Sequence, residues 1–354
     1  MITKHDDTGG LVSAGTVTAQ LLYEIAAPAY PNPDVVAHFD TLSLTQEGPH
    51  RVRIAGTRGS APPETLKVAL NQLGGYRNTM TLVLTGLDIA ERAAYAEQLL
   101  FEVLGGKDRF AETDVRLLRF DHPDAGSNPE ATAHLRITVK DPDPRKVGRV
   151  FSNATMELAL GGYAGFHTTT PPSPEAAYGV YWPALVPSRF VTQTAVLPDG
   201  TERAIPHTHP RQSGIPSGRV GDSVSPAAGA PGTAPAAADF GPTERAPLGT
   251  LCAARSGDKG GNANVGLWTR TAEQYAWLRQ HLTVATFRAL LPEAAELVVQ
   301  RHELPNLFAL NFVVVGLLGE GVASSTRPDP QAKGLGEYLR SRLTDIPTGL
   351  IGAG

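Results

Sequence analysis

The chain has 354 residues, 41% of them hydrophobic and 19% charged, and a net charge of −4. This composition supports ordinary hydrophobic cores and excludes a wholly disordered chain, while the lack of a basic excess argues against a nucleic-acid partner. Cys252 is the single cysteine, which excludes an internal disulfide and favours a reducing, cytoplasmic location, and neither a signal peptide nor an apolar run of about 18 residues suggests a membrane.

The first predicted elements lie before residue 60. Apolar residues recur at helical spacing over residues 17–25, after a polar segment that contains glycines, and prolines at 28, 31 and 33 end this helix. Alternating residues around Leu44 and Ile54 then predict two strands joined by a turn.

A longer segment, residues 79–196, predicts a ferredoxin-like unit. Asp88 and Glu91 resemble a capping box at the start of its first helix, and Gly105 ends that helix. The order is strand, helix, strand, strand, helix and strand, which is the split βαβ arrangement. We place the elements at residues 79–84, 88–104, 115–120, 133–139, 144–160 and within 178–196.

Residues 207–247 are rich in proline, alanine and glycine, and we predict a flexible linker there. A second α/β unit follows, with strands at 248–253, 263–268, 296–301 and 308–318 and helices at 271–291 and 331–343. The predicted fold class is therefore α+β: two compact ferredoxin-like units with antiparallel sheets. The expected division of the chain is a first domain at 1–206, the linker, and a second domain at 248–346.

The segment between the first two strands of the second unit is the strongest candidate for chemistry, and we interpret it as a glycine-rich loop. Asp258 and Lys259 are the predicted catalytic residues: Asp258 would act as a general base or orient Lys259, and Lys259 would pair with an anionic group. Glycines allow a ligand to approach the backbone, and polar neighbours supply hydrogen bonds. The predicted binding residues are Arg255, Ser256, Gly257, Gly260, Gly261, Asn262 and Asn264. A hairpin turn that satisfies its own backbone is the structural alternative.

Two further segments are candidates for anion binding. A glycine-containing loop that leads into a helix favours anions, and here it contains Lys4, His5, Thr8, Gly9 and Gly10. The alternative is a capped helix start after a loose terminus. Arg77 and Asn78 follow a pair of glycines and suit carboxylate or phosphate binding. A turn between a helix and a strand is the alternative there, and the turn chemistry favours it.

The remaining histidines and the cysteine predict neither a metal site nor a cofactor. His207 and His209 have no acidic or cysteine partner nearby in the sequence. His167 fits a hydrogen-bonded or exposed residue better than a base, and Cys252 fits a small buried hydrophobe. No serine hydrolase elbow, zinc-protease motif or dinucleotide fingerprint occurs.

Three segments together resemble one family, the acyclic terpene utilisation (AtuA) family. They are Thr-Lys-His at 3–5 with the following glycines and Gly-Thr-Val-Thr-Ala-Gln-Leu-Leu-Tyr-Glu-Ile at 15–25; Leu-Lys-Val-Ala-Leu at 66–70 with Gly-Gly-Tyr-Arg-Asn-Thr-Met-Thr at 74–81; and Ala-Arg-Ser-Gly-Asp-Lys-Gly-Gly-Asn-Ala-Asn-Val-Gly at 254–266. The last resembles the start of that family's ferredoxin-fold domain. The similarity covers essentially the whole chain outside the linker.

The resemblance implies a role in the catabolism of acyclic terpenes such as citronellol and geraniol, whose carbon skeleton is carried as acyl-CoA thioesters. The expected ligand is a branched unsaturated acid or its CoA thioester, and hydration or isomerisation would fit the residues. Lys259 and Arg77 would then hold the anionic end while Asp258 moves a proton.

Two alternatives to an enzyme stay open. Family members begin upstream of the Thr-Lys-His segment, so the chain can be a non-catalytic subunit that completes a separately encoded N-terminal half. It can also be a truncated product with no role of its own. An exposed sheet edge in a ferredoxin-like unit leads us to expect a homo-oligomer.

Overall fold

The computed structural model describes residues 1–207 and 238–352. The chain divides into two compact units. The central unit contains residues 71–182 and 323–328, and the composite unit contains residues 1–70, 183–322 and 329–354. The composite unit thus combines segments from both ends of the sequence. The domain boundaries expected at 206 and 248 stay a prediction.

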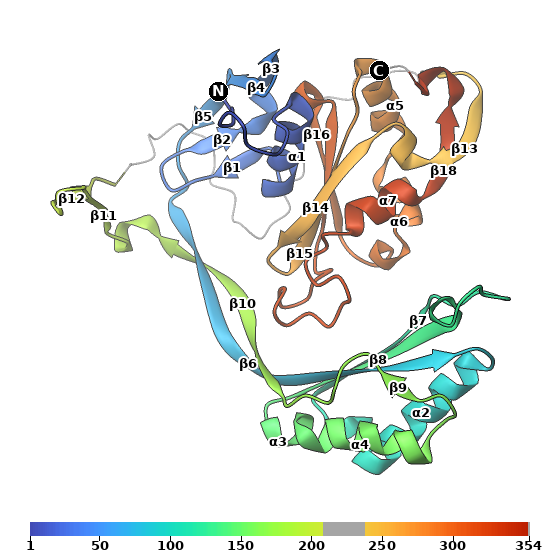
Figure 1. Ribbon diagram of the computed structural model, residues 1–354. Coiled ribbons are helices and arrows are strands. Elements are labelled where there is room, and N and C mark those ends of the chain that lie inside the picture. Colours follow the sequence, from blue (N-terminus) through green and yellow to red (C-terminus); the bar gives the residue numbers. More distant parts are fainter. Residues whose placement is uncertain (208–237, 353–354) are drawn as a thin grey trace. The chain divides into compact units, whose positions relative to one another are not determined.

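The central unit is built on a sheet with the strand order β10-β6-β8-β7. Helices α2 (Ile89–Leu104), α3 (Pro144–Val147) and α4 (Arg149–Gly161) lie together on one face of this sheet (Figure 1). The order of elements and of strands is that of the ferredoxin-like split βαβ unit. The strands are β6 (Thr65–Thr85), β7 (Glu112–Arg119), β8 (Thr132–Asp141) and β10 (Ala176–Pro187), and the short β9 (His167–Thr168) also pairs with β6.

Alternate residues of β6 form the core of the central unit. Met80, Leu82 and Leu84 are buried and pack in one cluster with Ala96 and Leu100 of α2. Because side chains alternate between the two faces along a strand, these three β6 residues share one face of the sheet, which is the face that the helices cover. Each leucine buried in this way stabilises the fold by about 1.5–3 kcal/mol relative to an exposed one.

The start of α2 and the Gly74-Gly75 pair both differ from expectation. Asp88 adopts a left-handed conformation (φ 55°) without a capping hydrogen bond, so the predicted capping box is wrong, because a capping residue needs an extended backbone. Gly74 and Gly75 lie inside β6 and not in a turn. A Cβ at Gly74 would lie 2.5 Å from the ring of Tyr178 on β10, so this glycine allows β10 to pack closely.

The composite unit is built on an antiparallel sheet with the order β14-β15-β17-β16. Helices α5 (Ala272–His281), α6 (Val284–Leu290) and α7 (Leu335–Ser341) pack on one face (Figure 1). On the other face, α1 (Ala14–Glu24) packs against β14 and β15. The strands are β14 (Ala253–Lys259), β15 (Asn262–Trp268), β16 (Val299–Leu304) and β17 (Ala309–Val314). Together with the central unit, this arrangement confirms the α+β class.

Smaller sheets complete the composite unit. They are β1-β2-β5, from β1 (Ala29–Pro31), β2 (Val36–His38) and β5 (Arg58–Ser60); β3 (Ser43–Gly48) with β4 (Arg51–Ala55); β11 (Gln193–Val196) with β12 (Glu202–Ile205); and β13 (Thr243–Pro247) with β18 (Leu343–Pro347). β13 occupies the end of the predicted linker, whose residues 208–237 lie outside the described residues.

Two predictions for the composite unit are wrong. The helix expected over 271–291 is two helices, because the side chain of Thr283 accepts a hydrogen bond from Thr286 N and starts α6. The segment from Arg255 to Asn264 is not a loop: it is the end of β14, a turn, and the start of β15. One face of β14 carries cations around a glycine, so hydrophobic alternation did not reveal a strand.

Candidate functional site

The candidate site is centred on the ring of Tyr23, in the last turn of α1. Gly257 of β14 lies against this ring, since a Cβ at that position would come within 2.3 Å of Tyr23 Cε2. Successive strand residues point to opposite faces, so Arg255 and Lys259 share the face of Gly257 and flank it. The spacing Arg-x-Gly-x-Lys therefore builds a slot for one aromatic ring between two cations.

Three cationic groups surround the Tyr23 ring, and we call Tyr23 with these residues the Tyr23 cluster. The distances to the ring centroid are 5.0 Å for Arg255 Cζ, 4.9 Å for Lys259 Nζ and 4.3 Å for Lys333 Nζ. Separations below about 6 Å allow a cation–π attraction. The ring thus stabilises a concentration of positive charge that would otherwise be unfavourable.

Lys333, which precedes α7, joins two polar partners. Its Nζ hydrogen-bonds with the hydroxyl of Tyr23 and lies 3.5 Å from Asp258 Oδ1. Burial by itself lowers the pKa of Lys333, but the hydrogen bond with Tyr23 and the charge of Asp258 outweigh it, and the net effect raises that pKa. Lys333 therefore keeps its proton. Its ammonium group links the phenol of Tyr23 with the carboxylate of Asp258.

Lys259 is more buried than Lys333. Its Nζ donates to Tyr23 O at 2.5 Å and to Asp258 O at 3.1 Å. Burial lowers the pKa of Lys259, and the carboxylates of Glu24 and Asp258 oppose that shift. Lys259 therefore releases a proton more readily than an exposed lysine does. Two lysines with opposite pKa shifts on one ring are the kind of arrangement found where protons are transferred.

A pocket of about 240 Å³ lies beside the cluster, between β14 and α7. Arg255, Ser256 and Lys333 line it, together with Ala254, Gly336 and Glu337. The hydroxyl of Ser256 accepts from Gly336 N at 2.8 Å and donates to Lys333 O at 3.2 Å. Ser256 therefore positions the start of α7, and the cations are the groups that can bind an anion in this pocket.

The other predicted residues of this segment have structural partners. Asn264 donates to Leu22 O at 2.6 Å, and Asn262 accepts from Gly316 N at 2.9 Å. Gly260 takes a positive φ of 65° in the hairpin turn. A Cβ at Gly261 would come within 2.1 Å of a backbone oxygen, at Gly319. These four residues shape the hairpin and hold α1.

The N-terminal candidate segment lies at the other end of α1. Lys4 Nζ donates to Thr8 O, and Thr8 Oγ1 donates to His5 O. Gly9 and Gly10 are exposed beside them. The 11 residues of α1 separate this segment from Tyr23, which corresponds to about 16 Å. The structure therefore does not bring Lys4, His5 or Thr8 together with the Tyr23 cluster.

Arg77 and Asn78 belong to the central unit. Arg77 Nη1 donates to Ala323 O at 2.9 Å and to Ser325 O at 3.3 Å, and Asn78 Nδ2 donates to Ser173 O at 3.0 Å. Both side chains thus hold backbone segments in place. The joint role that the sequence suggested for Lys259 and Arg77 stays a prediction.

Tyr23, Glu24 and Lys333 are the site residues that sequence reasoning missed. Tyr23 and Glu24 look like ordinary residues of an amphipathic helix, and Lys333 lies far along the chain from both. One signal was available: a glycine within a strand between two cations marks the close approach of another group. It does not reveal which group approaches.

The described histidines and Cys252 form no cluster that could hold a metal ion. Among residues 1–207 and 238–352, no three His, Cys, Asp or Glu side chains gather as a metal site requires. Cys252 is buried, and burial raises its pKa to about 12. His167 is exposed and hydrogen-bonds with Gly165 O, and His209 lies outside the described residues.

In the described part of the chain, no helix combines the length and the apolar character that crossing a membrane requires.

Comparison with known proteins places the chain in a family. Residues 1–197 match the model of the acyclic terpene utilisation family protein AtuA, and residues 246–344 match the AtuA ferredoxin-like domain. No curated protein and no solved structure matches the chain. The first match alone spans more than half of the sequence. The chain therefore belongs to the acyclic terpene utilisation family AtuA, and this membership implies a role in the use of acyclic terpenes.

Proposed function

We propose that the protein is a catabolic enzyme, or a subunit of one, that binds the anionic end of a branched unsaturated acid or its CoA thioester at the Tyr23 cluster. The observation that carries the proposal is the gathering of Arg255, Lys259 and Lys333 around one phenol beside an open pocket. Charge-assisted hydrogen bonds from such cations are the strong ones for carboxylates.

The same cluster supplies groups that move protons. Lys333 links the Tyr23 hydroxyl with Asp258, and burial lowers the pKa of Lys259. Hydration of a double bond needs a proton delivered to one carbon while water adds to the other carbon and loses a proton, and isomerisation needs a proton removed from one carbon and a proton delivered to another. Asp258 and Tyr23 are the proposed proton-transfer groups, and Arg255 and Lys259 are the proposed anion-binding groups.

Binding measurements on the full chain test the first half of the proposal. Calorimetric titration with geranic acid, and then with its CoA thioester, is expected to show saturable binding. Lys259→Ala is expected to weaken it at least about tenfold, because one charge-assisted contact is worth about 1.5–3 kcal/mol. Lys4→Ala is the matched control, a partly exposed lysine before the other end of α1. Unchanged affinity in Lys259→Ala, or a loss in Lys4→Ala instead, would contradict the proposal.

Activity measurements test the second half. Asp258→Asn keeps the shape of the side chain but removes its basicity, so turnover of a bound substrate is expected to fall while affinity changes little. Tyr23→Phe removes only the hydroxyl and keeps the ring between the cations. Full turnover in both variants would show that protons move elsewhere.

A non-catalytic role has one observation in its favour. Lys259 and Lys333 both bond to Tyr23 itself, so the cluster can serve only to fasten α1 to the sheet. The chain would then support a separately encoded partner. Isolation of the tagged chain from its native source, with identification of the bound proteins, tests this alternative. A stoichiometric partner would favour it, whereas recovery of the chain alone, as a monomer or as the expected homo-oligomer, would favour independent action.

A further inference from the structure

A second pocket of the composite unit has a different lining and a different chemistry. It encloses about 230 Å³ between the start of β14, the start of α5 and the end of α7. Arg270 and Arg340 line it with Gln274 and Trp268, and the remainder of the lining is Gly249, Thr250, Leu251, Cys252, Ala253 and Gly352. Among the described residues, two guanidinium groups and no carboxylate line this cavity, and it shares no lining residue with the pocket beside Tyr23.

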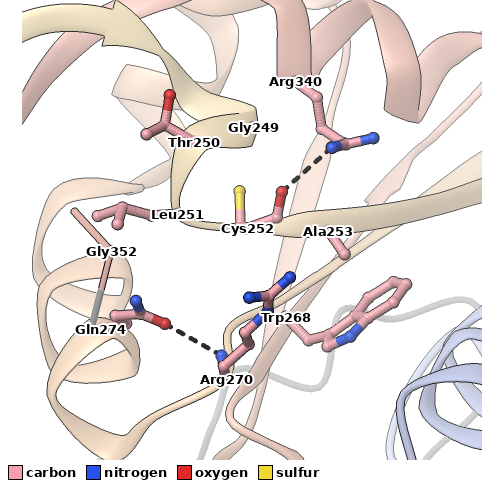
Figure 2. Close-up of a pocket in the computed structure, with 10 residues that line it drawn as sticks. All are labelled: Gly249, Thr250, Leu251, Cys252, Ala253, Trp268, Arg270, Gln274, Arg340 and Gly352. Atoms are coloured by element: carbon pink, nitrogen blue, oxygen red, sulfur yellow. Dashed lines mark hydrogen bonds between the residues drawn. The ribbon is translucent and has the colours of Figure 1, made fainter. Parts of the chain in front are cut away.

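Arg270 is the charged residue of this pocket whose side chain has no partner among the described residues. Its backbone N–H donates to Gln274 Oε1 at 3.1 Å, which fixes the backbone at the entrance to α5. Its side chain extends into the space between Cys252 and Trp268 (Figure 2). Within residues 1–207 and 238–352, its guanidinium group pairs with no carboxylate and no carbonyl. An arginine of this kind keeps its five donors for solvent or for a ligand.

Arg340 approaches from α7 and is held in place. Its Nε donates to Cys252 O at 3.1 Å, and its Nη1 donates to Glu337 Oε2 at 2.8 Å. These two bonds orient the guanidinium plane, whereas Nη2 bonds to no other described residue. Gly249 allows this approach, since a Cβ there would lie 3.1 Å from Arg340 Nε. Arg340 is therefore a preorganised donor, and Arg270 is an adaptable one.

We propose that this pocket binds a phosphate group. Guanidinium groups from two separate elements can contact different oxygens of a tetrahedral dianion, while a planar carboxylate is satisfied by one fork. Gln274 of the first turn of α5 also lines the pocket, so the positive end of that helix dipole adds to the attraction. This assignment is independent of the anion site at Tyr23 and goes beyond the proposed function.

Titration of the full chain with defined anions tests the phosphate site. Inorganic phosphate, adenosine 5′-monophosphate and acetate are added separately, and binding is followed by calorimetry and by the fluorescence of the tryptophans, since Trp268 lines the pocket. We expect saturable phosphate binding at about 1 mM and acetate binding at least about tenfold weaker. Tighter binding of the monophosphate would identify a phosphorylated organic ligand, and equal binding would identify free phosphate.

Three variants make the outcome decisive. Arg270→Ala is expected to weaken phosphate binding at least about tenfold, and Arg270→Lys less, because the charge remains but the fork is lost. Arg203→Ala, an exposed arginine of β12, is the matched control and is expected to leave binding unchanged. Because no described residue depends on the Arg270 guanidinium, Arg270→Ala is expected to fold. No saturation by either phosphate, equal binding of acetate, or unchanged affinity in Arg270→Ala would overturn the assignment.

Discussion

At the scale of single residues, the contact between Gly257 and Tyr23 explains why a glycine stands between two charged neighbours in β14. Any side chain at 257 would occupy the space of the Tyr23 ring. The ring in turn is what allows Arg255, Lys259 and Lys333 to lie close together. The small size of one residue therefore determines where the charge of the site can gather.

This contact gives the first prediction. Gly257→Ala is expected to destabilise the protein by about 1–3 kcal/mol, because an overpacked interior forces Tyr23 away from β14. Urea denaturation of the two proteins measures the difference. Gly349→Ala is the control, since a Cβ there meets nothing within 4 Å. Equal stability of Gly257→Ala and the wild type would mean that the ring does not lie over β14.

Sequence reasoning at this scale located the charged strand but not its partners. The residues from Arg255 to Lys259 stand out by composition alone, and Arg255, Gly257 and Lys259 lie against the Tyr23 ring. Tyr23 and Lys333 could not be predicted, because only the folded chain brings α1 and the segment before α7 to the same strand. Hydrophobic pattern predicts which face of an element is buried, not which distant side chain meets it.

At the scale of elements, two buried asparagines hold the end of α1. Asn264 of β15 donates to Leu22 O, and Asn311 of β17 donates to Ile25 O at 2.9 Å and to Ala26 O at 2.8 Å. The last carbonyls of a helix have no partners within the helix. The side chains of Asn264 and Asn311 supply hydrogen-bond donors to these carbonyls, and so the two asparagines anchor α1 on the sheet.

Asn311→Asp therefore gives the second prediction. The exchange replaces a donating amide by a carboxylate that faces two carbonyl oxygens, and a buried charge without a partner costs about 3–5 kcal/mol. Thermal and urea unfolding are expected to show the loss. Asn153→Asp, on the exposed face of α4, is expected to change stability by less than about 0.5 kcal/mol. Comparable losses in the two variants would contradict the anchoring role.

The third prediction concerns acid sensitivity at α5 and β16. Burial lowers the pKa of His281 and of His302 from 6.5. In the unfolded chain both histidines gain a proton at a higher pH than in the folded chain, so stability is lost as the pH falls through 6.5. His281→Gln with His302→Gln is expected to reduce the slope of unfolding free energy between pH about 7.5 and 5.5. His207→Gln, an exposed position, is the control, and an unchanged slope in the double variant would refute the prediction.

Predictions for elements succeeded where apolar periodicity was strong and failed where it was not. The helices around Ala96 and Leu339 and the strands of both sheets other than β14 follow from their buried faces. β14 was taken for a loop because cations and a glycine occupy its α1-facing side. Gly74 and Gly75 were taken for a turn because glycine serves both turns and close strand packing.

At the scale of the whole molecule, the composite unit depends on segments from both ends of the chain. Leu22, Ile25 and Leu42 form one apolar cluster with Leu304 and Ala309. The N-terminal segment is thus part of the packing of the ferredoxin-like sheet. Sequence composition did not predict this, because the two segments show no complementary motif.

The fourth prediction follows from this packing. A chain cut once between residues 207 and 238, at an inserted protease site, is expected to stay associated and to elute at the volume of the intact protein. The buried cluster and the asparagine bonds join the two pieces without the backbone. Size-exclusion chromatography after cleavage gives the answer, and addition of about 1 M salt tests whether charge alone joins them. Separation of the pieces at low salt would mean that the packing is too weak to act without the covalent connection.

The two halves of the Tyr23 cluster come from different matched regions: the phenol from residues 1–197 and the three cations from residues 246–344. In evolution, the site therefore depends on two separate stretches of the coding sequence. A recombination that exchanged one stretch for that of a distant relative would leave Tyr23 without its three cations, or the three cations without the Tyr23 ring. Substitutions at position 23 and on β14 should therefore be selected together.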